Sequence, residues 1–135
     1  MSLGGGVKSA VAVLAAVMLL GGCSRQVEIA DPLDPAVTAE IRRIKDLHLA
    51  STDPAWPAAE CDIVIYRIDE DSTYGWEHCR VVGSETESAW STPFAVRGEE
   101  IWHPQDGSEY ASSLQERFPA DLAEAVLERD LPTLP

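Results

Sequence analysis

Residues 61–82 read CDIVIYRIDEDSTYGWEHCRVV, and this stretch decides the fold. Two segments rich in β-branched and aromatic residues, 61–68 and 73–82, flank the polar residues 69–72. That composition is typical of a strand, a turn and a second strand, so we predict an antiparallel hairpin centred on Glu70. Three cross-strand pairs follow from that centre: Cys61 with Cys79, Val64 with Trp76, and Tyr66 with Tyr74.

We predict a second hairpin, with a tighter turn, in the segment that follows. A polar turn at residues 83–88 leads into a short strand at residues 89–92. Gly98 then begins a two-residue turn, because glycine readily adopts the positive φ that such turns demand. The expected pairing joins residues 94–97 to residues 100–103, with Val96 opposite Ile101 and Arg97 opposite Glu100.

A helix is predicted before the β region. Asp34 can cap it, with Pro35 at its first position, and it continues to about His48. Apolar residues recur at helical spacing along one side of it. They are Val37, Ile41, Ile44 and Leu47.

A second helical region is predicted after the β region. Ser113 and Glu116 have the spacing of a capping box, and Pro119 should kink the helix or divide it into two. Its apolar stripe consists of Leu114, Phe118, Leu122 and Val126. A helix, a β-meander of about four strands and a final helix predict an α+β fold, with the sheet covered by helices on one face.

The first 23 residues have the parts of a secretory signal. Lys8 supplies the positive charge, and the eleven apolar residues 10–20 are too few to span a bilayer, which takes roughly 20. Leu20-Gly21-Gly22-Cys23 matches the lipobox of bacterial lipoproteins residue for residue, and the segment resembles the leader of that family. The resemblance implies that Cys23 receives a diacylglycerol thioether. It also implies that cleavage makes Cys23 the N-terminus of a protein anchored to the outer face of the cell membrane.

This leader divides the chain into three parts. Residues 1–22 are expected to be a lipoprotein signal peptide, and residues 23–33 a lipidated cysteine and a tether reaching at most about 35 Å. Residues 34–135 are expected to form a single small α+β domain, since the 112 residues after Cys23 suit one domain and not two.

With Cys23 lipidated, Cys61 and Cys79 are the two thiols that remain. Disulfides persist outside the cytoplasm, and the predicted hairpin places these cysteines opposite each other. We therefore expect a disulfide that stabilises the domain by about 3 kcal/mol. A redox-active or zinc-binding pair is the alternative, because His78 adjoins Cys79, although no Cys-x-x-Cys motif supports it.

The chain is strongly acidic, with a formal charge of −13. Loss of Lys8 with the leader leaves nine basic and 23 acidic side chains, a formal charge of −14. This sign disfavours nucleic acid as a partner and favours a cationic envelope or secreted protein. We interpret the charge first as that of a solubilising surface, with such a partner as the alternative.

The sequence contains no motif for catalysis, a metal or a cofactor, so no enzyme activity and no cofactor are expected. The spacing of His48, His78 and His103 matches no metal-binding motif, and we interpret these residues as ordinary surface or rim residues. An alternative is a small envelope enzyme or metal-binding protein that uses His78, His103 and neighbouring acids. It requires those side chains to converge in one pocket.

Four aromatic residues are candidate binding residues: Tyr74, Trp76, Trp90 and Trp102. On a solvent-facing side of the sheet, Trp90 and Trp102 would form a platform for a sugar or a peptide. For any single one of them, however, we favour packing beneath the two helices. Taken with the leader, these features predict a lipid-anchored extracytoplasmic lipoprotein that acts as a non-catalytic binding or accessory module.

Overall fold

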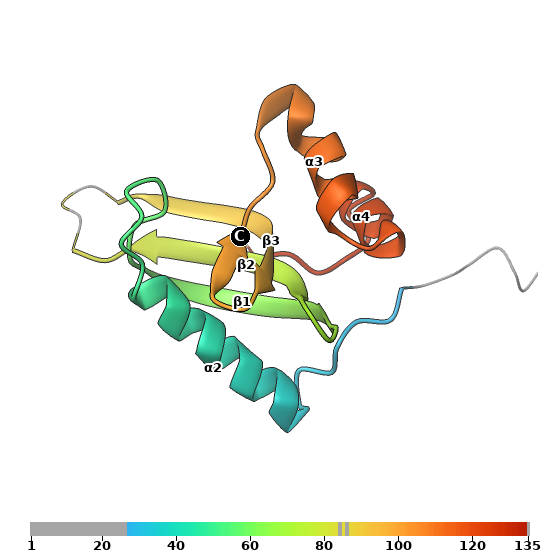
Figure 1. Ribbon diagram of the computed structural model, residues 1–135, viewed down its shortest axis with the longest axis horizontal. Coiled ribbons are helices and arrows are strands. Elements are labelled where there is room, and N and C mark those ends of the chain that lie inside the picture. The colour runs from blue at the N-terminus through green and yellow to red at the C-terminus, as the bar shows by residue number, and fades with distance from the viewer. Residues whose placement is uncertain (1–26, 84, 86, 135) are drawn as a thin grey trace, which may run out of the picture.

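The computed structural model describes residues 27–83, 85 and 87–134, so the lipobox and Cys23 lie outside the described residues. The predicted α+β fold is confirmed, with a four-stranded antiparallel sheet in the order β1-β2-β3-β4 and helices before and after it (Figure 1). Within the described part of the chain, no helix has both the length and the apolar character needed to cross a membrane. The elements are α2 (Pro35–Leu49), β1 (Ala59–Ile68), β2 (Thr73–Val81), β3 (Ala89–Arg97), β4 (Glu100–Trp102), a 3-10 turn (Gly107–Glu109), α3 (Tyr110–Arg117) and α4 (Ala120–Leu127).

The central hairpin pairs β1 with β2, and two of its three predicted contacts are confirmed: Cys61 opposite Cys79, and Val64 opposite Trp76. The third prediction, Tyr66 opposite Tyr74, is wrong. A β-bulge after Ile65 leaves Arg67 opposite Tyr74 instead. The extra residue lets Tyr66 enter the core, where it is 1% exposed and its hydroxyl donates to the carbonyl of Pro132 at 2.6 Å.

β3 is one continuous strand, although the sequence analysis divided it at Pro93. Proline has no N–H to donate to a sheet. However, β4 pairs only with residues 95–97, so Pro93 lies in the part of β3 that forms a sheet edge, where a missing donor is tolerated. The tight hairpin itself is confirmed, and Gly98 has a φ of +61°. Its pairs are Val96 with Ile101 and Arg97 with Glu100.

Both predicted helical regions form, and one of the two predicted N-caps is confirmed. Asp34 caps α2 as predicted, because its side chain accepts the N–H of Ala36 at 2.9 Å. The helical region after the sheet is divided at Pro119 as predicted, since Phe118 adopts the extended backbone that proline imposes on its predecessor. The predicted capping box at Ser113 is wrong. A 3-10 turn starts the helix earlier, so Ser113 lies inside α3 and its hydroxyl donates to the carbonyl of Tyr110.

Helices cover both faces of the sheet, whereas the sequence analysis expected one covered face (Figure 1). On the face called here the α2 face, Val37 and Ile44 pack with Ile65, Phe94 and Val96. The opposite face, called the α3/α4 face, packs Tyr66 and Ala95 against four residues of the C-terminal region: Leu114, Phe118, Leu122 and Val126. Ala95 and its neighbours in β3 belong to different cores because successive strand residues point to opposite faces.

The ends of the described chain also pack on this sheet. Ala30 donates its N–H to the carbonyl of Tyr66 at 2.9 Å, and Val27 packs against the α3/α4-face core. At the other end Leu131 is buried, and the carbonyl of Leu134 accepts the hydroxyl of Ser91 at 2.6 Å. Part of the segment expected to be a free tether is therefore in contact with the domain.

Gly75 allows the close approach of two strands, and we predict that Gly75→Ala destabilises the protein. A Cβ atom there would lie 2.2 Å from the carbonyl oxygen of Val64 and 3.0 Å from the ring of Phe94. Since a backbone carbonyl in a central hairpin has little freedom to move, we expect the free energy of unfolding to fall by about 2–3 kcal/mol in urea denaturation. The control is Gly107→Ala, which meets nothing within 4 Å but has a φ of +70° and should cost about 1 kcal/mol. Equal losses in the two variants would contradict the predicted clash.

Candidate functional site

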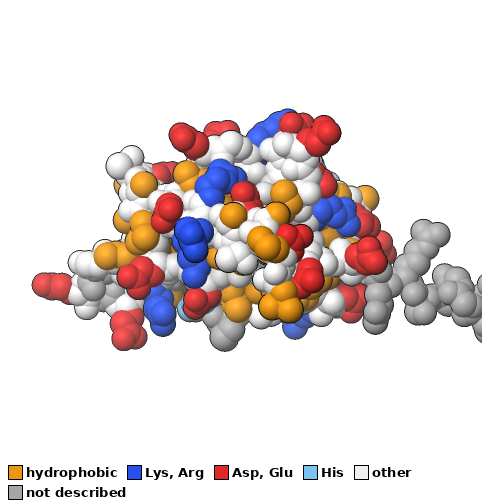
Figure 2. Space-filling model, turned by 90° about the horizontal axis from the view of Figure 1, so that it is seen from below, with side chains coloured by type: hydrophobic (Ala, Val, Ile, Leu, Met, Phe, Trp, Pro, Cys, Tyr) orange, Lys and Arg blue, Asp and Glu red, His pale blue; other side chains and the backbone are white. Residues whose placement is uncertain are grey.

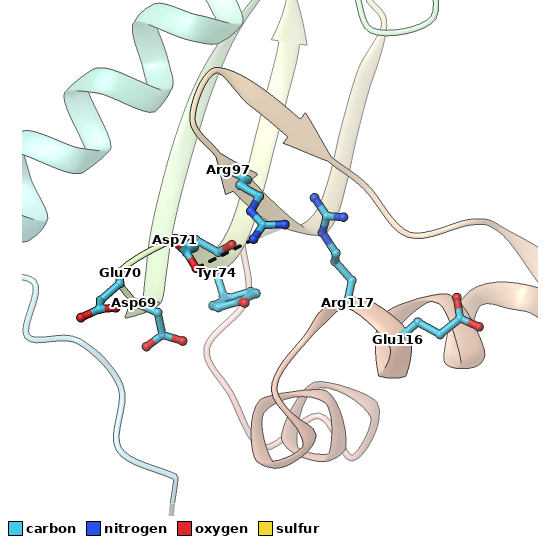
Figure 3. Close-up of a pocket in the computed structure, with 8 residues that line it drawn as sticks. Asp69, Glu70, Asp71, Tyr74, Arg97, Glu116 and Arg117 are labelled. Atoms are coloured by element: carbon cyan, nitrogen blue, oxygen red, sulfur yellow. Dashed lines mark ion pairs between the residues drawn. The ribbon is translucent and has the colours of Figure 1, made fainter.

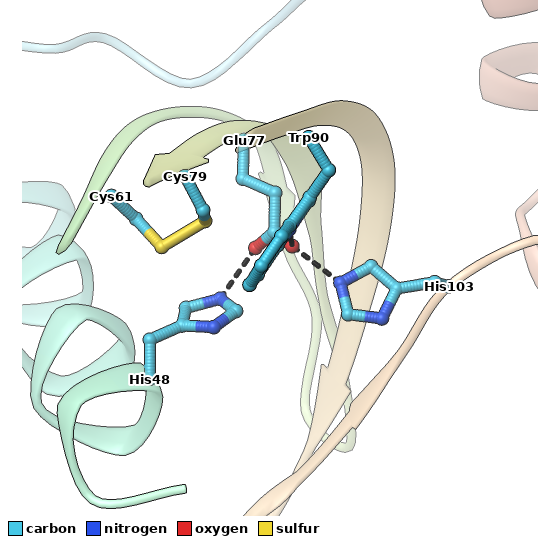
Figure 4. The surroundings of a disulfide bond; sticks show 6 residues. All are labelled: His48, Cys61, Glu77, Cys79, Trp90 and His103. Atoms are coloured by element: carbon cyan, nitrogen blue, oxygen red, sulfur yellow. Dashed lines mark hydrogen bonds and ion pairs between the residues drawn. A yellow bond between two sulfur atoms is a disulfide. The ribbon is translucent and has the colours of Figure 1, made fainter. Parts of the chain in front are cut away.

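Three side chains from separate elements meet on the α2 face. His48 comes from the last turn of α2, Glu77 from the middle of β2, and His103 from the residue directly after β4 (Figure 4). Side chains that are an even number of residues apart in a strand point to the same face of the sheet. Glu77 therefore points to this face together with Thr73 and Cys79. All three side chains are almost completely withdrawn from water, with exposed fractions of 3% for His48, 0% for Glu77 and 4% for His103.

The carboxylate of Glu77 lies at the centre of this cluster. Its Oε2 atom is 2.5 Å from Nε2 of His48, and its Oε1 atom contacts Nε2 of His103. Oε1 also accepts the indole N–H of Trp90 at 3.0 Å. One buried acid is therefore bound by three nitrogen atoms, and we call His48, Glu77 and His103 the histidine–glutamate cluster.

The histidines determine the charge state of Glu77. Burial by itself raises the pKa of this carboxyl group, because a charge is poorly solvated in the interior. Hydrogen bonds and charge interactions with His103 and His48 outweigh that effect and lower the pKa to about 2. Glu77 is therefore ionised at neutral pH. Since an ionised carboxylate only accepts hydrogen bonds, Nε2 of each histidine must carry the hydrogen.

Aromatic rings close the cluster from solvent. The ring of Trp56 stacks on His103, with centroids 3.8 Å apart and an angle of 23° between the planes. Trp56 also meets the edge of Trp90 at a centroid distance of 5.2 Å. The loop that carries Trp56 is held by Ser51, whose hydroxyl donates to the carbonyl of Trp56 at 2.6 Å. This loop after α2 thus covers the imidazole of His103, while the ring of Trp90 lies near the imidazole of His48, with centroids 6.4 Å apart.

The predicted disulfide between Cys61 and Cys79 is confirmed, and it adjoins the cluster (Figure 4). An imidazole nitrogen of His48, a carboxylate oxygen of Glu77 and the two sulfur atoms all lie within 4.8 Å of one another. In the disulfide the sulfurs are bonded to each other, so neither is available as a thiolate ligand. The grouping nevertheless combines nitrogen, oxygen and sulfur donors of the kinds that bind zinc.

The structure brings together a different pair of histidines from the pair named in the sequence analysis. His103 is joined by His48, while His78 follows Glu77 in β2 and so points to the α3/α4 face. The Nδ1 atom of His78 is buried and has no hydrogen-bond partner among the described residues. The interpretation of His48 and His103 as surface or rim residues is wrong, because both side chains are buried.

The four candidate aromatic residues are divided between the two faces. Trp90 lies on the α2 face and donates to Glu77. The other three pack with the α3/α4-face core: Tyr74, Trp76 and Trp102. Tyr74 and Trp102 both contact the ring of Phe118, and the guanidinium of Arg117 lies 5.8 Å from the Trp102 ring centroid. Trp90 and Trp102 therefore do not share a face.

A hollow of about 570 Å³ lies at the end of the sheet where the two hairpin turns approach α3 (Figure 3). Residues 69–72 and Tyr74 form one side, Arg97 another, and Glu116 and Arg117 the third. Asp71 and Arg97 form an ion pair at 3.8 Å, and both are largely exposed. Figure 3 shows Arg117 pointing from α3 toward Arg97, whereas Glu116 points away. Even without Glu116, the three carboxylates of residues 69–71 outnumber the two guanidiniums, so this charged hollow has a negative balance.

The exterior is acidic beyond this hollow. In Figure 2, Asp and Glu side chains are spread around the outline of the face shown, with Lys and Arg side chains set between them. The carboxylates do not gather in one patch on that face. The net charge therefore acts on the surroundings as a broad negative field, and the charged hollow is a concave part of this surface.

Neither Glu77 nor the burial of His48 was predicted, yet two patterns in the sequence indicate both. Glu77 occupies the same face of its strand as Thr73, Gly75 and Cys79, which points into the domain. An acidic side chain that points inward needs buried hydrogen-bond or charge partners. His48 continues the helical stripe of Val37 and Ile44, which would have placed it in the interior. No protein family model matches this chain, and neither curated proteins nor solved structures contain a significant match to it.

Proposed function

We propose that this protein is a membrane-anchored extracytoplasmic lipoprotein that acts as a non-catalytic binding or accessory module. The lipobox at residues 20–23 supports the anchor, and the Cys61–Cys79 disulfide is in keeping with an oxidising compartment. The observation that carries the binding role is the charged hollow, which is open to solvent. The histidine–glutamate cluster, by contrast, is closed, which favours a structural role for it in the oxidised protein.

An anchor at Cys23 would hold the domain close to the bilayer. Val27 already packs on the domain, and four residue steps separate it from Cys23. An extended chain covers roughly 3.3–3.6 Å per residue, so the linking segment spans at most about 14 Å. That is well below the reach expected for a tether of residues 23–33. The partner of such a module would therefore lie in the layer next to the membrane.

Cys23→Ala tests the anchor. We expect this variant to leave the membrane fraction or to keep its leader, because the thiol that accepts the lipid is absent. Cell fractionation and mass analysis of the N-terminus measure both outcomes. Cys61→Ala is the matched control, since it removes a cysteine without touching the lipobox and should stay in the membrane fraction. Unchanged membrane retention of Cys23→Ala would contradict lipid anchoring.

The charged hollow fits a cationic segment of an envelope or secreted protein. Its lining carries a net negative charge, and the whole chain is acidic, so Coulomb attraction favours a basic partner and weakens as salt is added. Tyr74 in its wall adds an aromatic surface on which a lysine or arginine side chain can lie. The expected complex is thus salt-sensitive and centred on the turn between β1 and β2.

A charge-matched pair of variants tests this role. In one, the three acids of residues 69–71 become amides; in the other, the same change is made at Glu124, Glu128 and Asp130, which are exposed residues outside the hollow. Each form is used to capture proteins from solubilised envelope extract at low and high salt. We expect one dominant basic protein to bind the wild type and the control at low salt and to be lost from the first variant. Equal loss from both variants, or no retained protein, would contradict the proposed site.

A further inference from the structure

We propose that reduction of the Cys61–Cys79 disulfide converts the neighbouring cluster into a binding site for a zinc-like divalent metal ion. The ligands would be the two thiolates, an imidazole nitrogen of His48 and a carboxylate oxygen of Glu77. In the oxidised chain a covalent bond then joins β1 to β2, and in the reduced chain a bound metal ion joins them. This inference does not depend on membrane anchoring or on the charged hollow.

The four donors are already gathered. They lie within 4.8 Å of one another, and all four residues are buried. Tetrahedral zinc with bonds of 2.0–2.3 Å places its ligand atoms about 3.3–3.8 Å apart. The two sulfurs, about 2.05 Å apart while bonded, must therefore separate by about 1.7 Å after reduction, and the other donors need adjustments of about an ångström. Two sulfurs, one nitrogen and one oxygen also form a donor set that zinc accepts, whereas calcium and magnesium require oxygen ligands.

Glu77 is held in the orientation that a ligand needs. Its Oε1 atom is engaged by His103 and by the indole N–H of Trp90, while Oε2 faces His48. Metal-binding carboxylates are characteristically fixed in this way by hydrogen bonds from residues outside the coordination sphere. His103 and Trp90 would therefore act as positioning residues for the carboxylate, and the metal would replace the hydrogen bond that now joins Oε2 to Nε2 of His48.

The disulfide can be reached from outside. A hollow of about 260 Å³ opens beside Cys61, with Lys45 and Leu49 from α2 on one side and Arg80 on another. Cys61 lines this hollow and is 7% exposed as a residue, whereas Cys79 is not exposed, so we expect a thiolate to attack at Cys61. The acidic exterior also raises the local concentration of divalent cations.

The conversion balances with a dithiol as reductant. One thiolate of the dithiol attacks the sulfur of Cys61, and its second thiol then displaces Cys61 from the mixed disulfide. The dithiol leaves as a cyclic disulfide, and two electrons and two protons pass to Cys61 and Cys79 as thiols. When the metal binds, both thiols lose their protons to water. The hydrogen on Nε2 of His48 moves to Nδ1 by exchange with water, so that the ring stays neutral and Nε2 can bind the metal.

The experiment uses the full chain carrying Cys23→Ser, so that its thiols come only from Cys61 and Cys79. One sample stays oxidised; the other is reduced with dithiothreitol and freed of it without air. Both are titrated with Co²⁺, a coloured stand-in for zinc. We expect the reduced chain alone to bind about one equivalent, with a sulfur-to-cobalt charge-transfer band and tetrahedral visible bands that Zn²⁺ then removes. Equal binding by both samples, or bound cobalt without the sulfur band, would overturn the proposal.

Variants separate this site from adventitious binding. His48→Gln and Glu77→Gln should weaken Co²⁺ binding by the reduced chain at least about 10-fold, whereas His78→Gln, on the opposite face, should leave it unchanged. Circular dichroism of the reduced wild type shows whether reduction by itself unfolds the chain. If reduction alone loosens the fold, one equivalent of metal should restore the spectrum. A reduced chain that stays unfolded with metal, or a His48→Gln variant that binds as tightly as wild type, would overturn the proposal.

Discussion

Replacing Glu77 by glutamine should lower the free energy of unfolding by about 3–5 kcal/mol. The carboxylate accepts hydrogen bonds from His48, His103 and Trp90 in a buried site. A glutamine of the same shape offers one oxygen, and its NH₂ group would face a nitrogen that also donates. At least one buried donor therefore loses its partner, and the charge that the imidazoles stabilise is gone. Urea denaturation followed by tryptophan fluorescence measures the loss.

The effect of Glu77→Gln should depend on pH with a definite sign. The pKa of this carboxyl group falls from 4.5 to about 2 on folding, so the folded state favours the ionised form. Its contribution is fully present above the unfolded pKa and is lost as the pH falls toward the folded one. We expect the stability difference between wild type and variant to shrink by about 3 kcal/mol between pH 5 and pH 2.

Glu124→Gln is the control for both measurements, because it makes the same chemical change at an exposed position of α4. It should alter the free energy of unfolding by less than about 0.5 kcal/mol at any pH. A Glu77→Gln variant that unfolds like this control would show that the histidine–glutamate cluster does not stabilise the fold.

Removal of the disulfide is the other change with a large expected effect. The double variant Cys61→Ala, Cys79→Ala should lose about 3 kcal/mol, since the bridge joins residues separated by 18 positions and restricts the unfolded chain. For one domain of this size, that is a large share of the total stability. The measurement is urea denaturation of the double variant and of the oxidised wild type.

Chemical reduction provides an independent check on this prediction. Reduced wild type in the presence of a chelator should match the double variant within about 1 kcal/mol, because both lack the bridge. Addition of Zn²⁺ should then stabilise the reduced wild type and leave the double variant unchanged. A double variant as stable as the oxidised protein would contradict the stabilising role of the bridge.

Most of the fold could be predicted from local patterns. The turn residues and the pairing of Cys61 with Cys79 set the first hairpin, Gly98 set the second, and the N-cap at Asp34 and the break at Pro119 set the helix ends. Each of these features depends on neighbours in the sequence. Local chemistry of that kind is visible without knowledge of the tertiary structure.

The errors came from tertiary contacts. The bulge next to Tyr66 exists because that ring fills the core and reaches Pro132, 66 residues further along the chain. The two covered faces could have been inferred from the consecutive apolar residues 63–66 and 94–96, since a strand with one exposed face alternates. The capping box at Ser113 failed because the preceding 3-10 turn extended the helix toward the N-terminus.

The candidate site was the least predictable part. His48, Glu77 and His103 are separated by 29 and 26 residues and match no spacing motif. They meet because α2 packs along β1, so that its last turn lies beside Glu77 of the neighbouring strand, and because His103 continues the alternation of β4 onto the same face. A pattern search within one element cannot detect such a meeting, although the buried register of Glu77 signals that partners must exist.

The most direct test of this account is an NMR measurement of the imidazole nitrogens of His48 and His103. The buried carboxylate of Glu77 requires hydrogens on Nε2 of both rings. We therefore predict two Nε2–H signals that exchange slowly with water in the wild type and disappear or shift strongly in Glu77→Gln. Rapid exchange of both protons, or spectra identical in the two proteins, would contradict the histidine–glutamate cluster.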